Sequence, residues 1–426
     1  MNDVLSSWLP TQLKDGWRLT KNREFCSIVN GYPCPSEGFN TNGEGIPIVR
    51  IRDITSGSTN TYFKGEYPSE QIINTNDLLI GMDGDFNVRL WSSGKALLNQ
   101  RCCNVRCKDE LIKKYLYFVL PIQLKIINEL KNSTTVKHLN NEDILDAQIV
   151  IPNKYDHISK IVNYLDSKTK CIDRILSVLN DILEKIIAYR QSLITRAVTK
   201  GLDPNVEMKD SGVEWIGSIP REWKTSKISF VSDVTLGKML CPRQTDSEQT
   251  LETYLCAGSI SWDGVKDYIK EMWFSSKEKS ELLLIAGDVL VVEGGAGFGM
   301  TTLYKGEHSP CYFQNSIIRV RGHHNVMTSD FINYWMRFTY TAYLKTVCNE
   351  ATFSHYTKEK VSETPILVPP LNEQKKIADF CKLVDERVKT ICAGIENQIS
   401  KLNEYRSSLI SAAVTGQLAI DEKASA

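Results

Sequence analysis

The chain contains an internal duplication, and this repeat limits the possible folds more than any other feature. Residues 189–199 read YRQSLITRAVT and residues 405–415 read YRSSLISAAVT, so eight of eleven positions match at an offset of 216. Further matches occur in the same order: STTVKHL (133–139) with EATFSHY (350–356), and NDLLIGMDG (76–84) with GDVLVVEGG (287–295). One unit of about 210 residues is therefore present twice, and both copies are expected to share one fold.

Each copy begins with a part of mixed α and β character. Short β-rich runs are separated by Gly, Asn and Ser turns; examples are IPIVRIRDI (46–54), NQRCCNVRC (99–107) and NSIIRVR (315–321). Helices are expected at 113–131, with Pro121 inside the helix, and at 329–347. This pattern predicts an α/β (α+β) globular domain in each copy.

The second part of each copy has the seven-residue apolar repeat of a coiled coil. In the first copy the series is Ile158, Leu165, Ile172, Leu179, Ile186 and Leu193, with Ile161, Ile175 and Ile182 three residues further on. In the second copy it is Cys381, Val388, Ile395, Leu402 and Leu409, with partners Ile377, Val384, Ile391 and Tyr405. We expect two long helices forming an antiparallel coiled coil, which would relate the copies by a pseudo-twofold axis. The alternative is a long amphipathic helix that lies on its own globular domain.

These patterns divide the chain into six segments. The predicted boundaries are 1–152 for the first globular domain, 153–200 for a first long helix, 201–214 for a linker, 215–369 for the second globular domain, 370–417 for a second long helix and 418–426 for a C-terminal tail. Gly201 and Pro204 end the first helix, and the charged stretch after them is expected to form no core.

The composition indicates a soluble globular protein, with 42% hydrophobic and 24% charged residues. No run approaches the roughly 18 apolar residues of a membrane helix, and the N-terminus lacks the pattern of a signal peptide, so a cytoplasmic location is expected. The 51 basic and 51 acidic residues cancel, which argues against binding nucleic acid through bulk charge alone. The twelve cysteines show no regular framework, and no metal site is expected.

The segment DVLVVEGGAGFGMTT (288–302) resembles a cofactor-binding glycine loop at first sight. The other copy has GMDGDFNVR (81–89) at the equivalent place, so most of these glycines are not part of the shared scaffold. A phosphate-binding loop also needs a helix directly after it, whereas TTLYKGEHSPCYF predicts strand and turn. We therefore expect a variable strand-to-strand tip and no cofactor.

The sequence contains no recognisable catalytic motif. The Asn-Pro-Pro-Tyr and Asp-Pro-Pro-Tyr sequences of amino-methyltransferases are absent, and the acid-x-Lys triplets lie outside the strand context of a nuclease. His138 and His355 occupy equivalent places before the long helices, where each is expected either to contact DNA or a partner, or to cap the domain junction. The chain is therefore interpreted as a binding protein. Two related domains on paired helices match two DNA half-sites at a fixed spacing.

The chain resembles the specificity (S) subunit of type I restriction–modification systems along essentially its whole length. The resemblance rests on AVTKGLDPNVEMKDSGVEWIGSIPREW (197–223) and on PPLNEQKKIADF (369–380) before a helix ending in YRSSLISAAVTGQL (405–418). It implies two target recognition domains, each reading one half of a bipartite, asymmetric sequence in double-stranded DNA. It also implies helices that set the spacing and dock two methylation subunits. Those subunits would use S-adenosylmethionine to methylate adenine, and restriction subunits would add ATP-driven translocation and cleavage. The present chain would then hold no cofactor and no catalytic residue.

A coiled-coil adaptor with two protein-binding domains remains the alternative function. On the DNA-binding interpretation, arginine is the usual reader of guanine, and Asn or Gln that of adenine. The predicted contacts on the variable tips are Arg50, Arg52, Asn87 and Arg89 in the first domain, and Lys238, Arg243, Phe298, Gln314 and Asn315 in the second. For each of them the alternative is a solvated loop residue or a phosphate contact. Cys256 stands where the first domain has Arg50, as readers of different half-sites would show.

Overall fold

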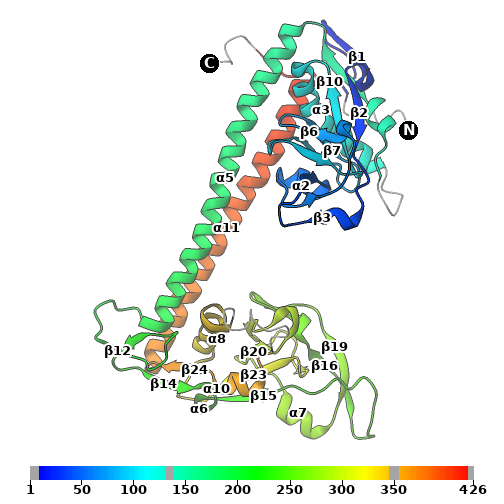
Figure 1. Ribbon diagram of the computed structural model, residues 1–426. Coiled ribbons are helices and arrows are strands. Elements are labelled where there is room, and N and C mark those ends of the chain that lie inside the picture. The colour runs from blue at the N-terminus through cyan, green and yellow to red at the C-terminus, as the bar shows by residue number, and fades with distance from the viewer. Residues whose placement is uncertain (1–8, 131–137, 345–354, 421–426) are drawn as a thin grey trace. The chain divides into compact units, whose positions relative to one another are not determined.

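The computed structural model describes residues 9–130, 138–344 and 355–420. Two compact units are present: unit 1 comprises 1–180 and 396–426, and unit 2 comprises 181–395. Each unit contains one copy of the mixed α and β part together with about half of each long helix (Figure 1).

The centre of unit 1 is a four-stranded antiparallel sheet. Its strand order is β2 (Cys26–Asn30), β10 (Cys102–Cys107), β7 (Leu78–Gly81) and β8 (Val88–Leu90). Helix α3 (Glu110–Leu130) packs against β8 and β10, and its aromatic and aliphatic residues form a common core with the sheet. Pro121 lies inside α3, as expected from the sequence.

A second, five-stranded sheet in unit 1 has the order β3 (Phe39–Asn40), β5 (Tyr62–Phe63), β4 (Ile46–Val49), β9 (Ala96–Leu98) and β6 (Ile72–Ile73). Strands β4 and β9 run parallel. Outside this sheet, β1 (Trp17–Lys21) pairs with β11 (Gln148–Pro152), and the short helices are α2 (Ile51–Ser56) and α4 (Asn141–Leu145). The run 46–54 is thus only half strand. After Val49 the chain turns into α2, whose N-terminus Asp53 stabilises by accepting a hydrogen bond from the Arg50 N–H at 2.9 Å.

Unit 2 repeats the four-stranded sheet of unit 1, whereas a three-stranded and a two-stranded sheet stand where unit 1 has five strands. Its four-stranded antiparallel sheet has the order β15 (Ser232–Leu236), β23 (Ile317–Gly322), β20 (Val289–Val292) and β21 (Thr301–Leu303). Helix α8 (Ser329–Thr339) packs on it and continues as one π-helical turn, Tyr340–Leu344. Strand β14 (Lys224–Lys227) pairs with β24 (Pro365–Val368) as β1 does with β11. The parallel pair recurs as β16 (Thr250–Leu255) with β22 (Tyr312–Phe313). The predicted duplication is confirmed.

The remaining elements of unit 2 lie around these sheets. They are strands β17 (Ile260–Ser261), β18 (Gly264–Val265) and β19 (Lys270–Phe274), and helices α6 (Ile228–Val231), α7 (Ser276–Leu282) and α10 (Lys358–Glu363). The predicted linker also has structure. Strand β12 (Met208–Asp210) of the linker forms a hairpin with β13 (Ser218–Pro220) just beyond it, and Val213 of the linker packs against the core of unit 2. The expectation that this stretch forms no core was therefore wrong.

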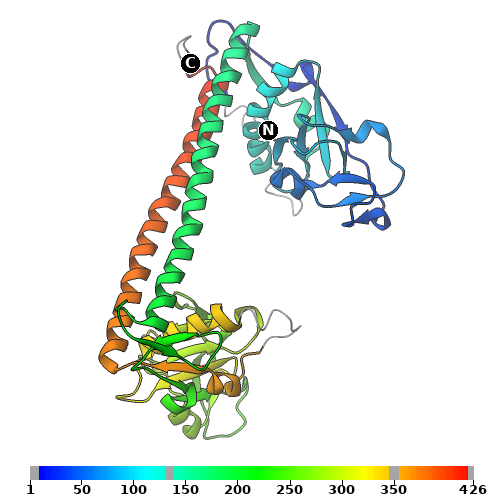
Figure 2. The same ribbon diagram turned by 60° about the vertical axis from the view of Figure 1, so that its left-hand side comes forward.

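The two long helices are α5 (Tyr155–Lys200) and α11 (Leu371–Val414). In unit 1, Trp17 packs on His157 near the start of α5, with ring centroids 5.3 Å apart. It also lies against Gly416, just beyond the end of α11. In unit 2, Gly201 after the end of α5 lies against Glu373 at the start of α11. Within each unit the helix halves are therefore antiparallel and side by side (Figures 1 and 2).

The interface between these helix halves contains the predicted heptad series. Ile158, Leu165, Ile172, Leu409 and Cys381 are buried, and the other members are half-buried; these are Leu179, Ile186, Leu193, Val388, Ile395 and Leu402. Ion pairs add to the contact between the helices. Arg406 lies 3.6 Å from Asp173 in unit 1, and Arg190 lies 2.7 Å from Asp385 in unit 2.

Of the predicted partners of this series, Ile161, Ile377 and Val384 are buried, whereas the partners further along the helices are exposed. Ile175, Ile182, Ile391 and Tyr405 belong to this exposed group. The residues four positions after the series face the interface instead, and they are half-buried: Leu176, Leu183, Cys392 and Ile399. A heptad alternates steps of three and four residues, so one apolar series fits either core position. In this part of the helices the partners in the interface lie four residues after the series. The exposed apolar residues three positions after it form a second row on the surface.

Candidate nucleic-acid interface

The glycine-rich segment forms the turn between β20 and β21. A short 3₁₀ turn, Gly295–Gly297, follows β20, and β21 then pairs antiparallel with β20. A phosphate-binding loop requires the N-terminus of a helix at this point, and this turn does not have one. In unit 1 the equivalent turn joins β7 to β8 and contains Asp85, Phe86 and Asn87. The predicted strand-to-strand tip is confirmed.

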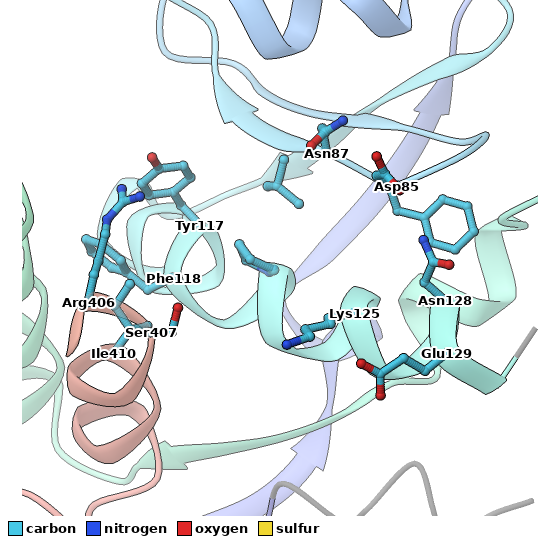
Figure 3. Close-up of a pocket in the computed structure, with 13 residues that line it drawn as sticks. Asp85, Asn87, Tyr117, Phe118, Lys125, Asn128, Glu129, Arg406, Ser407 and Ile410 are labelled. Atoms are coloured by element: carbon cyan, nitrogen blue, oxygen red, sulfur yellow. The ribbon is translucent and has the colours of Figure 1, made fainter. Parts of the chain in front are cut away.

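A pocket of about 530 Å³ lies beside the β7–β8 turn in unit 1 (Figure 3). The turn, helix α3 and helix α11 line it; the charged and amide side chains among the lining residues are Asp85, Asn87, Lys125, Asn128, Glu129 and Arg406. Two carboxylates and two cationic groups give it no clear preference for an anion. The Asn128 side chain donates a hydrogen bond to the Gly84 carbonyl at 2.7 Å, which anchors the turn that carries Asn87 to α3.

Two of the arginines predicted to contact DNA in the first domain hold the local structure together. The Arg50 guanidinium donates to the Asp53 carboxylate at 3.0 Å and to the Thr61 hydroxyl at 2.5 Å. Arg89 donates to the carbonyl oxygens of Ile54 and Thr55, at 3.1 and 2.5 Å. Either arginine would have to release these bonds to reach a base edge.

Arg52 and Asn87 are the available contacts of the first domain. Arg52 is exposed on α2, and Asn87 is half-exposed at the tip between β7 and β8. Among the residues that the structure describes, neither side chain makes a hydrogen bond or ion pair. Both therefore remain candidates for base contacts.

The candidates of the second domain divide in the same way. Lys238 is only 11% exposed; it pairs with Glu278 at 2.5 Å and lies 5.3 Å from the centre of the Phe274 ring. Phe298 packs edge-on against Tyr356, with ring centroids 6.3 Å apart. Arg243, by contrast, is exposed, and its side chain has no polar partner within residues 9–130, 138–344 and 355–420. It is the cationic candidate of this domain that is available to DNA.

Gln314 and Asn315 lie at the turn between β22 and β23. The Gln314 side-chain oxygen accepts a hydrogen bond from the Ser316 hydroxyl at 3.3 Å. The structure places Asn99 and Gln100 at the equivalent turn between β9 and β10, and sequence reasoning missed both. The signal was an amide pair before the long strand of each copy, LLNQRCC and YFQNSII.

The two equivalent histidines lie at the ends of equivalent strands. His138 bridges to Asp83 after β7, with Nδ1 2.6 Å from the carboxylate, and Arg101 lies 3.1 Å from the same carboxylate. His355 bridges to Gly294 after β20, where an added Cβ would lie 2.6 Å from its Nδ1. Both histidines are exposed, so a contact to DNA and a capping role both fit their positions.

Within the described ranges no group of three or more His, Cys, Asp or Glu residues is placed to hold a metal ion. No helix among the described residues is long and apolar enough to cross a membrane. Burial raises the pKa of the Cys103 thiol to about 12, and the same cause raises that of Cys381 to about 12. These thiols are core groups.

Comparisons with known proteins show where this architecture occurs. The profile of the type I restriction modification DNA specificity domain matches residues 14–184 and 220–401. The type I restriction enzyme EcoBI specificity subunit of Escherichia coli is 25% identical over 422 residues, covering 95% of this chain and 87% of the relative. The MjaVIII specificity subunit of Methanocaldococcus jannaschii is 21% identical over 436 residues, covering 96% and 94%.

A solved structure shares the fold. It comes from work on complex assembly and conformational transition of the type I R-M system and superposes with a TM-score of 0.69. It covers 96% of this chain and 100% of the solved chain at 15% identity. The profile matches one domain in each half of the duplicated sequence. The chain belongs to the type I restriction–modification DNA specificity family, and its role is that of a DNA-recognition specificity subunit.

Proposed function

We propose that each recognition domain reads one half of a bipartite, asymmetric DNA target. The observation that carries this proposal is one sheet scaffold built twice with different tips. At the equivalent tips the first domain has Asp85, Phe86 and Asn87, where the second has the glycine-rich turn. Readers with different tips on one scaffold are expected to bind different bases.

The long helices set the distance between the two half-sites. A helix rises about 1.5 Å per residue, so each seven-residue repeat in α5 or α11 contributes about 10 Å of length. Continuous helical hydrogen bonding makes such an element stiff, so the spacer of the target is expected to follow helix length.

The exposed apolar row on the helices is the docking surface for two methylation subunits. Tyr189 is 65% exposed and Tyr405 is 54% exposed, and they occupy the same position of the repeat. Ile175 and Ile391 form a second equivalent pair, also exposed. Apolar side chains at regular helical spacing on a free surface mark an interaction site. Because the row occurs in both copies, two molecules of the same partner can each bind one copy.

The chemistry resides on these partners in the cytoplasm. DNA and the other subunits of the restriction–modification complex are the partners of this chain. The methylation subunits bind S-adenosylmethionine and methylate adenine, and the restriction subunits couple ATP to translocation and cleavage. The chain itself supplies recognition and geometry and needs no cofactor.

Exchange of one recognition domain tests this proposal. Residues 215–369 would be replaced by the corresponding domain of another specificity subunit, and the methylated sequence mapped in cells that also contain the methylation subunits. We expect one half-site to change and the other to persist. A change in both half-sites would contradict the one-domain, one-half-site assignment. No DNA affinity in a complex that assembles would favour the coiled-coil adaptor.

A further inference from the structure

The two recognition domains share one exposed chemical feature, a pair of amide residues at the same turn. The pair is Asn99–Gln100 in unit 1 and Gln314–Asn315 in unit 2. We propose that the side-chain amides of Gln100 and Asn315 contact the DNA sugar–phosphate backbone, one in each half of the target. This inference rests on the proposed function, in which each domain binds one half-site.

In unit 1 the backbone of this turn is fixed by three hydrogen bonds. The Asn99 N–H donates to the Val49 carbonyl at 3.0 Å, and the Gln100 N–H donates to the Tyr32 carbonyl at 3.0 Å. The Cys102 N–H then donates back to the Asn99 carbonyl at 2.9 Å. The turn therefore lies where β4 and β9 end and just after β2, and its position is set by the sheets.

Unit 2 has the same three hydrogen bonds. The Gln314 N–H donates to the Leu255 carbonyl at 2.9 Å, and the Asn315 N–H donates to the Lys238 carbonyl at 2.8 Å. The Ile317 N–H donates to the Gln314 carbonyl at 2.9 Å. Asn315 is therefore the structural equivalent of Gln100, although the two amide residues occur in the opposite order in the two copies.

A glycine beside each turn shows how closely the segments approach. An added Cβ at Gly31 would lie 2.0 Å from the Asn99 carbonyl oxygen, and one at Gly237 would lie 2.3 Å from the Gln314 carbonyl oxygen. Real Cβ contacts are not this short, so each turn leaves room only for glycine. The backbone that carries each amide is thus held rigidly, and little ordering is needed before a ligand binds.

The side chains at these two positions are available. Gln100 is exposed and Asn315 is half-exposed. In the described part of the chain neither side-chain amide forms a hydrogen bond. An amide NH₂ is a donor suited to phosphate oxygens as well as to bases.

The neighbours of the shared amides differ between the domains. Arg101 follows Gln100, whereas Ser316 follows Asn315. Half-sites of different sequence have different base edges but the same sugar–phosphate backbone. An amide residue occurs at one rigid position in both recognition domains, although their neighbouring residues differ. It therefore fits a contact to the sugar–phosphate backbone, which carries no sequence information.

The test uses the assembled methylation complex, with this chain and its methylation subunits, and fluorescence anisotropy on duplexes carrying the mapped target. Gln100→Ala and Asn315→Ala are compared with Asn42→Ala, an exposed amide substitution away from the turn. We expect each turn variant to bind about tenfold more weakly, because one hydrogen bond to a charged group is lost. The ratio of the affinities for the target duplex and for a duplex with one substituted base is expected to stay as in the unsubstituted complex. Asn42→Ala is expected to bind DNA with normal affinity.

Neutral methylphosphonate linkages then locate the contact. One methylphosphonate in the first half-site should weaken binding of the unsubstituted complex but add nothing to Gln100→Ala. If the losses of affinity from the methylphosphonate and from Gln100→Ala add fully at every linkage, the backbone contact is overturned. Relaxed specificity at one base position would show that the amide reads that base. Normal binding by both turn variants would also overturn the inference. If the unsubstituted complex shows no preference for a split target, the proposed function itself fails.

Discussion

Substitution of Gly237 by alanine tests the close packing beside the amide turn of unit 2. An added Cβ at Gly237 would lie 2.3 Å from the Gln314 carbonyl oxygen and 2.5 Å from the Phe313 carbonyl oxygen. Both atoms belong to a backbone that hydrogen bonds hold in place, so neither can rotate away as a side chain would. The strain must therefore displace the turn or the start of the loop after β15.

The size of the effect follows from this geometry. Overpacking in a core costs about 1–3 kcal/mol, and a clash with fixed backbone belongs at the upper end, about 3 kcal/mol. For a unit of 150–250 residues each kcal/mol lowers the melting temperature by about 2–4 °C, so a fall of about 6–12 °C is expected. Differential scanning calorimetry of the purified chain would resolve such a shift.

Gly394→Ala is the matched control, because Gly394 lies inside α11 in the same unit with open space around it. Alanine is favoured over glycine in a helix by about 1 kcal/mol, so this variant should be slightly more stable. Equal melting temperatures for Gly237→Ala and the unsubstituted chain would refute the steric reasoning. Methylation provides a second measurement for Gly237→Ala. Methylation should be lost first at the half-site that the second domain reads.

Three further predictions concern the long helices. Arg190→Ala should lower the free energy of unfolding by about 1–2 kcal/mol, because it removes a 2.7 Å ion pair with a largely buried Asp385. Arg406→Ala, at the same repeat position but 3.6 Å from Asp173, should lower it by less than about 1 kcal/mol. Hydrogen exchange of α11 peptides measures both losses, and equal losses would contradict the ranking. Tyr189→Asp and Tyr405→Asp should leave the fold intact, and each should weaken the binding of one methylation subunit. Native mass spectrometry should then show a complex of one chain with one methylation subunit. Retention of two subunits by both variants would rule out the exposed row as the docking surface. Deletion of residues 172–178 removes one heptad, about 10 Å of helix, and should change the preferred spacer or prevent assembly; an assembled complex with an unchanged spacer would disprove the role of helix length.

Much of the architecture could be predicted from the sequence because the duplication constrains both halves at once. The matches at an offset of 216 required one fold built twice, and the four-stranded sheets of both units have the same strand order. The place of the glycine-rich segment, at a turn between the antiparallel strands β20 and β21, was also predictable, because the other copy lacks its glycines.

Local backbone choices were harder to predict. The run 46–54 alternates like a strand, yet the chain leaves β4 after Val49 and forms α2. The decisive interaction is the Asp53 cap on the Arg50 N–H, a single hydrogen bond that apolar periodicity does not encode. In the same way, the heptad series fitted two core positions, and only packing selected between them.

The polar contacts of the recognition domains could be predicted least. The sequence does not distinguish a charged loop residue that faces solvent from one that, like Arg89, donates to two carbonyl oxygens within its own domain. The equivalence of Gln100 and Asn315 depends on hydrogen bonds between segments far apart in sequence. Alignment of the two copies around LLNQRCC and YFQNSII is the sequence observation that leads to it.

The most direct test of the central claim is a genome-wide map of methylated adenine. Cells that express this chain with its neighbouring methylation subunit would be compared with cells lacking only this chain. We predict a split, asymmetric motif that appears only when the chain is present, and that reveals both half-sites together. The same methylation pattern in both kinds of cell, when the chain and the methylation subunit co-purify from the cells that express both, would contradict its role in choosing the DNA target.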